Sequence, residues 1–216
     1  MKPEKKEGWQ MIVEFYEDHV IKHPKNKEQM EKTILPYLQS IGKENELEER
    51  VSKMVEDTGR AIRILKASDI PRGYLANLTF LKDGAIRQDR VPTLDEVFQK
   101  SDDEGLKRII DKYIEFITFL WGYGIHEKTY KMSSNFGLVG DEIVLVDPFE
   151  ITDLRKKVLA DIRKRKWAKD SRYGENLNKK MIAYLVGRAN EAWTEERLKE
   201  VWGRDKRDNW VRRKKS

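Results

Sequence analysis

Cysteine is absent from the 216-residue sequence, which excludes a disulfide framework and thiolate chemistry. Histidine is scarce, and three residues of this type argue against a histidine-based zinc site. No apolar run is long enough to span a bilayer, and the lysine-rich start lacks the apolar core of a signal peptide. We therefore expect a cytoplasmic protein with no membrane partner.

Positive charge is concentrated toward the C-terminus, although the net charge of the whole sequence is only +6. Residues 155–172 hold nine basic and two acidic side chains, and residues 203–216 hold seven and two. Such patches suit an acidic protein or a nucleic acid as partner. Solvated helix faces and a frayed tail have the same composition, so both interpretations stay open.

Hydrophobic periodicity separates a first part that contains strands from a second part that is mainly helical. Hairpins are predicted over 11–22 and 74–91, and helices over 27–41, 47–66, 106–121 and most of the chain after 150. Pro36 inside the first helix predicts a kink or a break. The polar residues 1–8 are expected to be disordered.

The most informative segment combines a predicted hairpin with a polar side chain at each end. Phe136–Val139 and Ile143–Val146 are short apolar runs, and Gly140-Asp141-Glu142 between them is typical of a turn. Asn135 precedes the first run and Asp147 follows the second. Because a hairpin brings its ends together, we expect the amide and the carboxylate to lie side by side, where their oxygens suit a hard cation and phosphate oxygens.

This arrangement resembles the catalytic segment of the protein-kinase-like superfamily, especially its divergent bacterial, archaeal and phage members. There an Asn ends the catalytic loop, a hairpin follows, and an Asp opens the next loop; both side chains hold Mg²⁺ on the nucleotide phosphates. The resemblance implies an α+β, two-lobed fold with ATP and Mg²⁺ as cofactors. Residues 1–92 would form a reduced N-lobe with a small antiparallel sheet plus helices. Residues 93–216 would form a helical C-lobe that contains segment 124–150 and a basic tail, with Asn135 and Asp147 binding metal and nucleotide.

Further roles follow from the order of elements in that family. Lys22, which ends a predicted strand, would contact the α- and β-phosphates of ATP. Glu31 is our preferred partner for this lysine. The alternatives are Glu28, Glu44 and Glu48. The backbone of residues 90–93 would bind adenine.

The sequence departs from the family pattern at two places. The catalytic Asp of the family lies five residues before the Asn, where this sequence has Tyr130, and a phenol does not take up a proton at neutral pH. Glu127, His126 or Lys131 would have to replace it, and Lys131 would also place a charge against the γ-phosphate. The glycine-rich loop is reduced to Gly8, so a lid over the phosphates is expected to be short or absent.

These observations leave three hypotheses. The first is a kinase-like phosphotransferase that uses ATP and Mg²⁺ on an unidentified acceptor. The second is a pseudokinase that binds nucleotide as a sensor or a binding partner, which Tyr130 and the reduced glycine loop favour. The third is a nucleic-acid-associated protein that uses residues 163–167 and the tail 210–215, where aromatic residues among basic ones would stack on bases.

Overall fold

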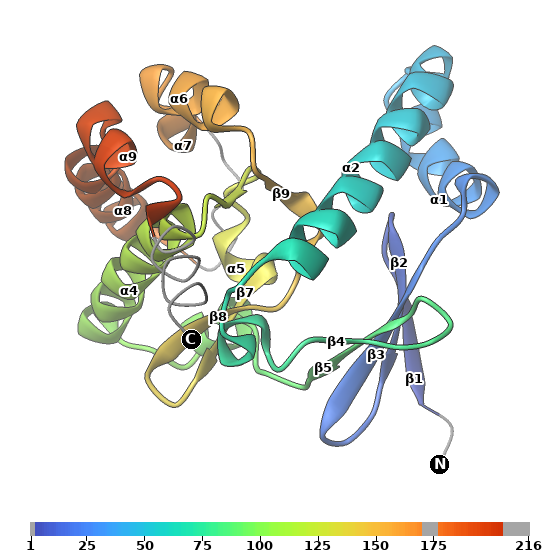
Figure 1. Cartoon of the computed structure of the whole chain (residues 1–216), viewed down its shortest axis with the longest axis horizontal. Helices are drawn as coiled ribbons and strands as arrows, with labels where there is room; N and C mark the ends of the chain where they lie inside the picture. The colour runs from blue at the N-terminus through green and yellow to red at the C-terminus, as the bar shows by residue number, and fades with distance from the viewer. Residues whose placement is uncertain (1–2, 170–176, 205–216) are drawn as a thin grey trace, which may run out of the picture.

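A five-stranded antiparallel sheet begins the chain in the computed structural model, which describes residues 3–169 and 177–204 (Figure 1). The strand order is β1-β2-β3-β5-β4, with β1 at Glu4–Glu7, β2 at Met11–Phe15, β3 at His19–Pro24, β4 at Thr79–Phe80 and β5 at Ile86–Asp89. Burial alternates along β3, because successive side chains of a strand point to opposite faces. Val20 and Lys22 therefore share the buried face of the sheet.

The expectation that residues 1–8 are disordered is wrong for the part of this segment that the structure describes. Strand β1 pairs antiparallel with β2, with Glu4 opposite Phe15 and Glu7 opposite Ile12. All four side chains of β1 are exposed, and Lys5 forms a 2.6 Å ion pair with Glu14 on the neighbouring strand. A short, charged edge strand is a common way to end a sheet, and cross-strand charge pairing compensates for the lack of apolar side chains.

Two helices follow β3 and pack against each other at one end of the molecule (Figure 1). Helix α1 covers Lys27–Ser40 and begins with a capping box between Asn26 and Gln29. Helix α2 covers Leu47–Ala67, after the 3₁₀ turn η1 at Glu44–Glu46. The pair has a small core of its own, formed by Met30, Ile34, Leu38 and Val51. Pro36 lies inside α1, which continues to Ser40 without a break.

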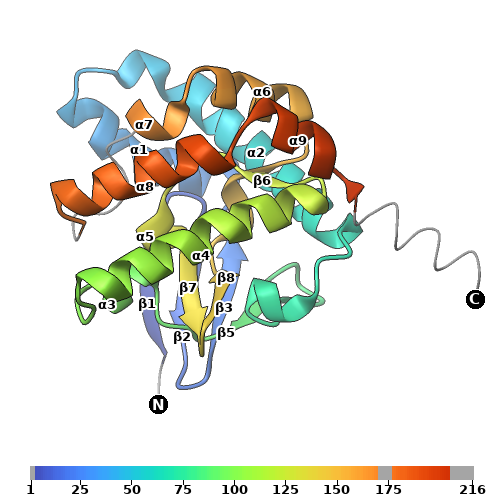
Figure 2. The same ribbon diagram turned by 90° about the vertical axis from the view of Figure 1, so that its left-hand side faces the viewer.

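The second part of the chain is built around the most apolar helix, α4, at Asp103–Gly122. The remaining helices are α3 at Leu94–Phe98, α5 at Met132–Asn135, α6 at Arg155–Arg163, α7 at Lys166–Lys169, α8 at Lys179–Ala192 and α9 at Glu195–Val201. Helices α8 and α9 pack on α4 (Figure 2). Ile110 and Ile117 of α4 are fully buried in a core that extends to Ile86 of the sheet. The described residues therefore form an α+β fold with a small antiparallel sheet.

Two short ribbons lie between the sheet and these helices. Strands β7 (Phe136–Val139) and β8 (Glu142–Leu145) form the predicted hairpin, and β6 (His126–Glu127) pairs with β9 (Ile151–Thr152). Short 3₁₀ turns at Arg72–Leu75 (η2) and Pro148–Glu150 (η3) complete the fold. Among residues 3–169 and 177–204, none of the helices combines the length and apolar character that crossing a membrane requires.

The hairpin β7–β8 touches the segment after β5 through a glycine. Gly137 forms an isolated bridge with Thr93, and Leu138 donates a backbone hydrogen bond to the carbonyl of Pro92. A Cβ at position 137 would lie 2.6 Å from the Pro92 carbonyl oxygen and 2.8 Å from a methyl group of Val91. Both distances are shorter than van der Waals contact, so only glycine allows this approach.

We expect Gly137→Ala to destabilise the protein by about 1–3 kcal/mol, the usual cost of overpacking. Gly187→Ala is the matched control, because a Cβ there meets nothing within 4 Å. Since Gly187 lies inside α8, this control should be neutral or stabilising by up to about 1 kcal/mol. Denaturant unfolding measures both changes, and equal stability of the two variants would contradict the close approach at Gly137.

Candidate functional site

The hairpin brings Asn135 and Asp147 to the same end of the β7–β8 ribbon. The backbone carbonyl of Asn135 accepts hydrogen bonds from the N–H groups of Val146 at 2.9 Å and Asp147 at 3.0 Å. These bonds follow from the register, in which Phe136 is opposite Leu145. The two residues thus lie as the hairpin pattern in the sequence predicts, with Asn135 buried and the Asp147 side chain 46% exposed.

Lys22 reaches the same point from the sheet. Its ammonium nitrogen Nζ donates a 2.5 Å hydrogen bond to the Val146 carbonyl and lies 3.9 Å from Oδ1 of Asp147. Burial lowers the pKa of Lys22, and the negative charge of Asp147 opposes part of this effect. The structure therefore joins the predicted lysine to the predicted aspartate across two elements that are far apart in the sequence.

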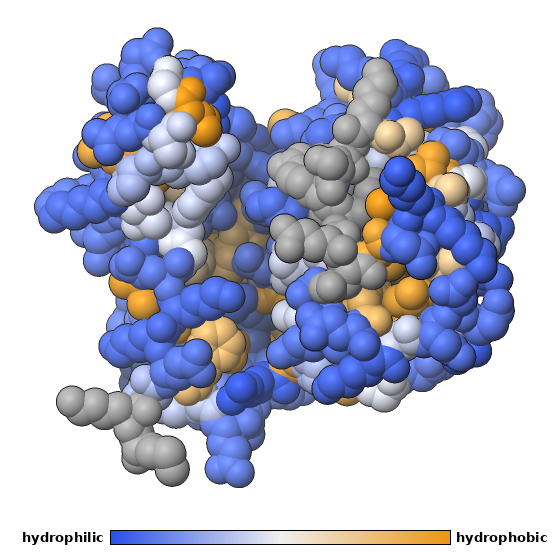
Figure 3. Space-filling view, turned by 180° about the vertical axis from the view of Figure 1, so that it is seen from behind, coloured by the Kyte–Doolittle hydropathy of each residue, from blue (hydrophilic) through white to orange (hydrophobic). Residues whose placement is uncertain are grey.

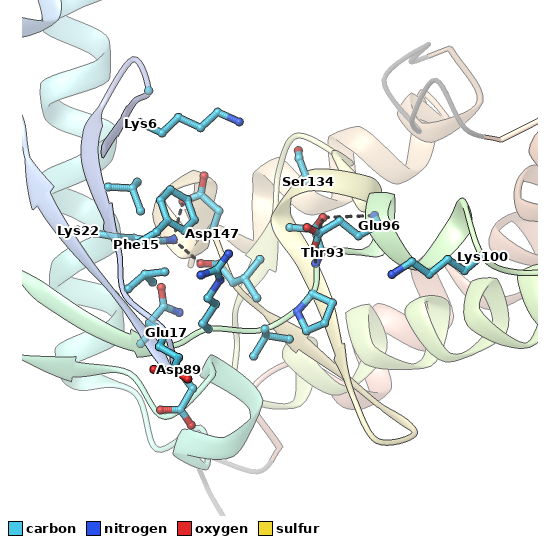
Figure 4. A pocket seen from close by; sticks show the side chains of 18 residues that line it. Lys6, Phe15, Glu17, Lys22, Asp89, Thr93, Glu96, Lys100, Ser134 and Asp147 are labelled. Atoms are coloured by element: carbon cyan, nitrogen blue, oxygen red, sulfur yellow. Dashed lines mark hydrogen bonds and ion pairs between the residues drawn. The ribbon is translucent and has the colours of Figure 1, made fainter. Parts of the chain in front are cut away.

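A cavity of about 600 Å³ opens beside this contact, within the size range of small-molecule sites. In Figure 4, Lys22 and Asp147 point toward each other in it, and Phe15 of β2 lies nearby. Apolar side chains line the cavity between the sheet and the hairpin, namely Val13, Phe15, Val20, Val91 and Val146. The cavity therefore joins an apolar wall to the buried cation of Lys22 and the carboxylate of Asp147, and Glu17, Asp89 and Glu96 also line it.

The segment 90–93 lines the same cavity, but most of its backbone groups are already bonded. The N–H of Arg90 bonds the Asp18 carbonyl, and that of Thr93 bonds the Glu96 carboxylate. Pro92 has no N–H, and its carbonyl accepts from Leu138. Within the described residues, Val91 is the position of this segment whose backbone N–H has no partner.

The amide of Asn135 is held by three acceptors on one side. Its Nδ2 lies 3.2 Å from Oε1 of Glu127, 3.3 Å from the Thr129 hydroxyl and 3.3 Å from Oε2 of Glu150. Only an N–H₂ group can donate to these oxygens, so the amide orientation is determined. Its Oδ1, which accepts from Ser134 at 3.3 Å, is then the atom that can bind a cation.

Glu127 is fully buried and holds the loop that follows it. Its carboxylate accepts the backbone N–H groups of Thr129 at 2.9 Å and Tyr130 at 2.7 Å. Burial raises the pKa of Glu127 to about 7; the hydrogen bonds from Thr129 oppose the rise and the charge of Glu150 adds to it. Lys131 forms a 2.9 Å ion pair with Glu150. Glu127 and Lys131 thus belong to one cluster around Asn135.

Tyr130 and His126 are enclosed in the core, and neither lines the cavity. Tyr130 is 1% exposed, and its ring packs on Trp167 and Trp193. His126 accepts from Trp121 through Nδ1, so its Nε2 carries the proton toward the Tyr130 hydroxyl at 3.2 Å. Burial lowers the pKa of His126 to about 3. The proposal that His126 replaces the catalytic base is therefore wrong, because it cannot reach a substrate.

Glu31 does not meet Lys22. It lies on α1 with a side chain 37% exposed, and its nearest cation is Lys27 at 3.8 Å. Asp57 of α2, which sequence reasoning missed, lines a cavity together with Lys22. The sequence held a signal for Asp57, because it lies three residues after Met54 and residues three apart share a helix face.

Asp57 and Lys22 both line a second cavity of about 350 Å³. Asp57 bonds Lys128 at 2.7 Å and Lys53 at 3.1 Å. Burial alone would raise the pKa of Asp57, but these two hydrogen bonds outweigh it and the pKa is lowered. The carboxylate therefore stays charged and tied to two lysines.

The second cavity adjoins the first at Lys22 and Asp147, which line both. The turn between β1 and β2, Gly8–Gln10, covers it, and Gly8 also lines the first cavity. Figure 3 shows a hollow between the α1–α2 pair and the C-terminal helices, in a surface that is mostly hydrophilic. This turn contains Gly8, the one glycine that the sequence offers at the place of the family's glycine-rich loop.

Within the described ranges, no three His, Cys, Asp or Glu residues gather closely enough to hold a metal ion. A divalent cation would need Asp147 and Oδ1 of Asn135 together with oxygens that a ligand brings. The donor set of carbonyl and carboxylate oxygens fits Mg²⁺, which prefers to complete its shell with phosphate and water oxygens.

The aromatic residue of the basic segment 163–167 is buried. Trp167 is 2% exposed and donates to Asn190, so it cannot stack on bases. Arg163 forms a bidentate ion pair with the carboxylate of Glu195, with hydrogen bonds of 2.9 and 3.0 Å. The tail 210–215 lies outside the described residues.

Comparison with known proteins gives little beyond the geometry. No protein-family model matches the chain, and no curated protein matches it in sequence. Among solved structures, a crystal structure of WbdD is similar with a TM-score of 0.41 and 11% identity over 90% of this chain. The match covers 47% of the WbdD chain, so this chain spans about half the length of that protein.

The buried carboxyl group of Glu127 generates a pH prediction. An acid with a raised folded pKa contributes stability that is complete below its unfolded pKa, near 4.5, and is lost as the pH rises through about 7. The free energy of unfolding should therefore fall from about pH 5 to about pH 8, and Glu127→Gln should remove this fall. Urea unfolding across that range checks it, with the exposed Glu142→Gln as control. An unchanged pH dependence in Glu127→Gln would contradict the assignment.

Proposed function

We propose that this chain is a two-lobed, kinase-like protein that binds ATP with Mg²⁺ between a reduced N-lobe of residues 1–92 and a C-lobe of residues 93–216. One observation carries the proposal: Lys22 from the sheet and Asp147 after the hairpin lie 3.9 Å apart at the edge of a cavity of about 600 Å³. An amine for the phosphates and a carboxylate for the metal are the minimum that triphosphate binding needs.

The proposed pose uses the apolar wall for the base and the charged edge for the phosphates. Val20 and Val146 line the cavity and would enclose the adenine ring, and the N–H of Val91 would donate to a ring nitrogen. Lys22 would bind the inner phosphates, and Asp147 with Oδ1 of Asn135 would hold Mg²⁺. The phosphate charges would also favour the ammonium form of Lys22, which burial disfavours.

A pseudokinase is the second candidate, and the position of Tyr130 favours it. The residue five places before Asn135 is a buried phenol that is bonded to His126, so no group there takes the proton of an acceptor. In this alternative the protein binds Mg²⁺–ATP as a sensor or a partner, without transfer.

The binding proposal predicts that Lys22→Met and Asp147→Asn each weaken Mg²⁺–ATP binding by roughly 10–100-fold, since each removes a charged contact worth about 1.5–3 kcal/mol. Isothermal titration calorimetry measures the affinities. Lys27→Met is the matched control, because Lys27 is an exposed lysine that pairs with Glu31 on α1. Removing Mg²⁺ with a chelator should weaken the wild type and leave Asp147→Asn nearly unchanged.

Two results would contradict the proposal. One is an absence of Mg²⁺–ATP binding by the wild-type protein. The other is binding that Lys22→Met and Asp147→Asn leave as strong as in Lys27→Met.

A further inference from the structure

The acidic side chains near the candidate site differ in what they can touch. Glu127 is fully buried, and both of its oxygens hold the loop through Thr129 and Tyr130. Asp57 is tied to Lys128 and Lys53. Asp147 faces Lys22 and is assigned to the metal. Each of these three carboxylates is therefore either bonded within the protein or assigned to the metal.

Glu150 is the remaining carboxylate that opens onto the second cavity. Its side chain is 23% exposed. Its Oε2 is held by Lys131 at 2.9 Å, the Thr129 hydroxyl at 3.2 Å and Asn135 at 3.3 Å. None of the hydrogen bonds or ion pairs within the described residues uses its Oε1. The group is thus fixed through one oxygen and open at the other.

The backbone explains why Glu150 faces the same space as Asp147. Residues 148–150 form the 3₁₀ turn η3, and Asp147 is its N-cap. Side chains three residues apart eclipse each other in a 3₁₀ helix. Both carboxylates line the second cavity, where Lys22 and Lys131 also lie. The second cavity shares Lys22 and Asp147 with the first cavity, so it adjoins the proposed phosphate and metal site.

We propose that Glu150 is the general base of a phosphoryl transfer, and that the hydroxyl group of the acceptor enters the second cavity; this rests on the proposed binding of Mg²⁺–ATP. The acceptor O–H gives its proton to Oε1 of Glu150. The acceptor oxygen forms a bond to the γ-phosphorus while the bond from that phosphorus to the β,γ-bridging oxygen breaks, and ADP leaves with the bonding electrons. Lys131 holds Glu150 and faces the γ-phosphoryl group as a cation.

Two other roles fit the geometry less well. A third metal ligand is disfavoured because Glu150 is paired with Lys131 at 2.9 Å, so a divalent cation bound to its carboxylate would lie beside an ammonium group. Lys131 itself is a poor base, because its ammonium group has no lone pair while it is paired with Glu150. Glu150 therefore supplies, from the turn η3 after the hairpin, the base that position 130 does not provide.

The test measures binding and turnover separately, with water as the acceptor. Mg²⁺–ATP affinity is measured by calorimetry, and ADP production from Mg²⁺–ATP is measured in the same buffer. Glu150→Gln keeps an oxygen for Lys131, so we expect wild-type affinity and a rate of ADP production lower by about 10²–10⁴-fold. Glu142→Gln, an exposed carboxylate at the start of β8, is the matched control and should keep the wild-type rate. Glu150→Asp, which retains a carboxylate, should recover part of the rate if the glutamine variant folds poorly.

The outcomes distinguish this inference from the proposed function. A wild type that binds Mg²⁺–ATP but produces no ADP overturns the role of Glu150 and leaves the binding proposal intact. A Glu150→Gln variant that is as active as Glu142→Gln does the same. A wild type that does not bind Mg²⁺–ATP overturns the proposed function, and the role of Glu150 falls with it.

Discussion

Two backbone hydrogen bonds, from the N–H groups of Val146 and Asp147 to the carbonyl of Asn135, close the base of the β7–β8 hairpin, and the candidate site depends on this closure. The same Val146 accepts the ammonium group of Lys22 through its carbonyl. One residue therefore connects the hairpin to the sheet. A shift of the hairpin against β3 would move the proposed metal ligands and the phosphate-binding amine relative to each other, so the packing at Gly137 matters for the site as well as for stability.

Burial disfavours the charged forms of two groups in the site, and an anionic ligand would reduce this free-energy cost for Lys22. Burial lowers the pKa of Lys22 and raises that of Glu127, so each group is driven toward its neutral form. Shifted groups beside a cavity are typical of functional sites, although structural ion pairs produce them too. Burial causes both pKa shifts, but the two groups have different surroundings. Lys22 faces a cavity that an anion can fill, whereas Glu127 faces backbone N–H groups and has a structural task.

Local patterns in the sequence predicted the parts of the site that local structure determines. The hairpin, the neighbouring positions of Asn135 and Asp147, and a lysine on β3 all follow from short-range periodicity and turn chemistry, although β3 continues past Lys22 to Pro24. The prediction for Glu31 was wrong because tertiary packing decides which helix side chains line the cavity beside Lys22. Helix α1 contributes Ile34 there, while Glu31 is partly exposed and pairs with Lys27. Strand β1 was missed because its side chains are all charged, and its partner strand supplies the stabilising contacts.

The conformation of Tyr130 links these observations. Its φ of +56° places it in the left-handed region, which a non-glycine residue adopts only when its surroundings compensate for the strain. Glu127 compensates by accepting the Tyr130 N–H, and the aromatic core accepts the ring. A loop turned inward in this way cannot present the side chain of residue 130 to the cavity. The same turn leaves Lys131 directed at Glu150. Lys131, the residue after Tyr130, thus fixes the carboxylate that we propose as the base in place of residue 130.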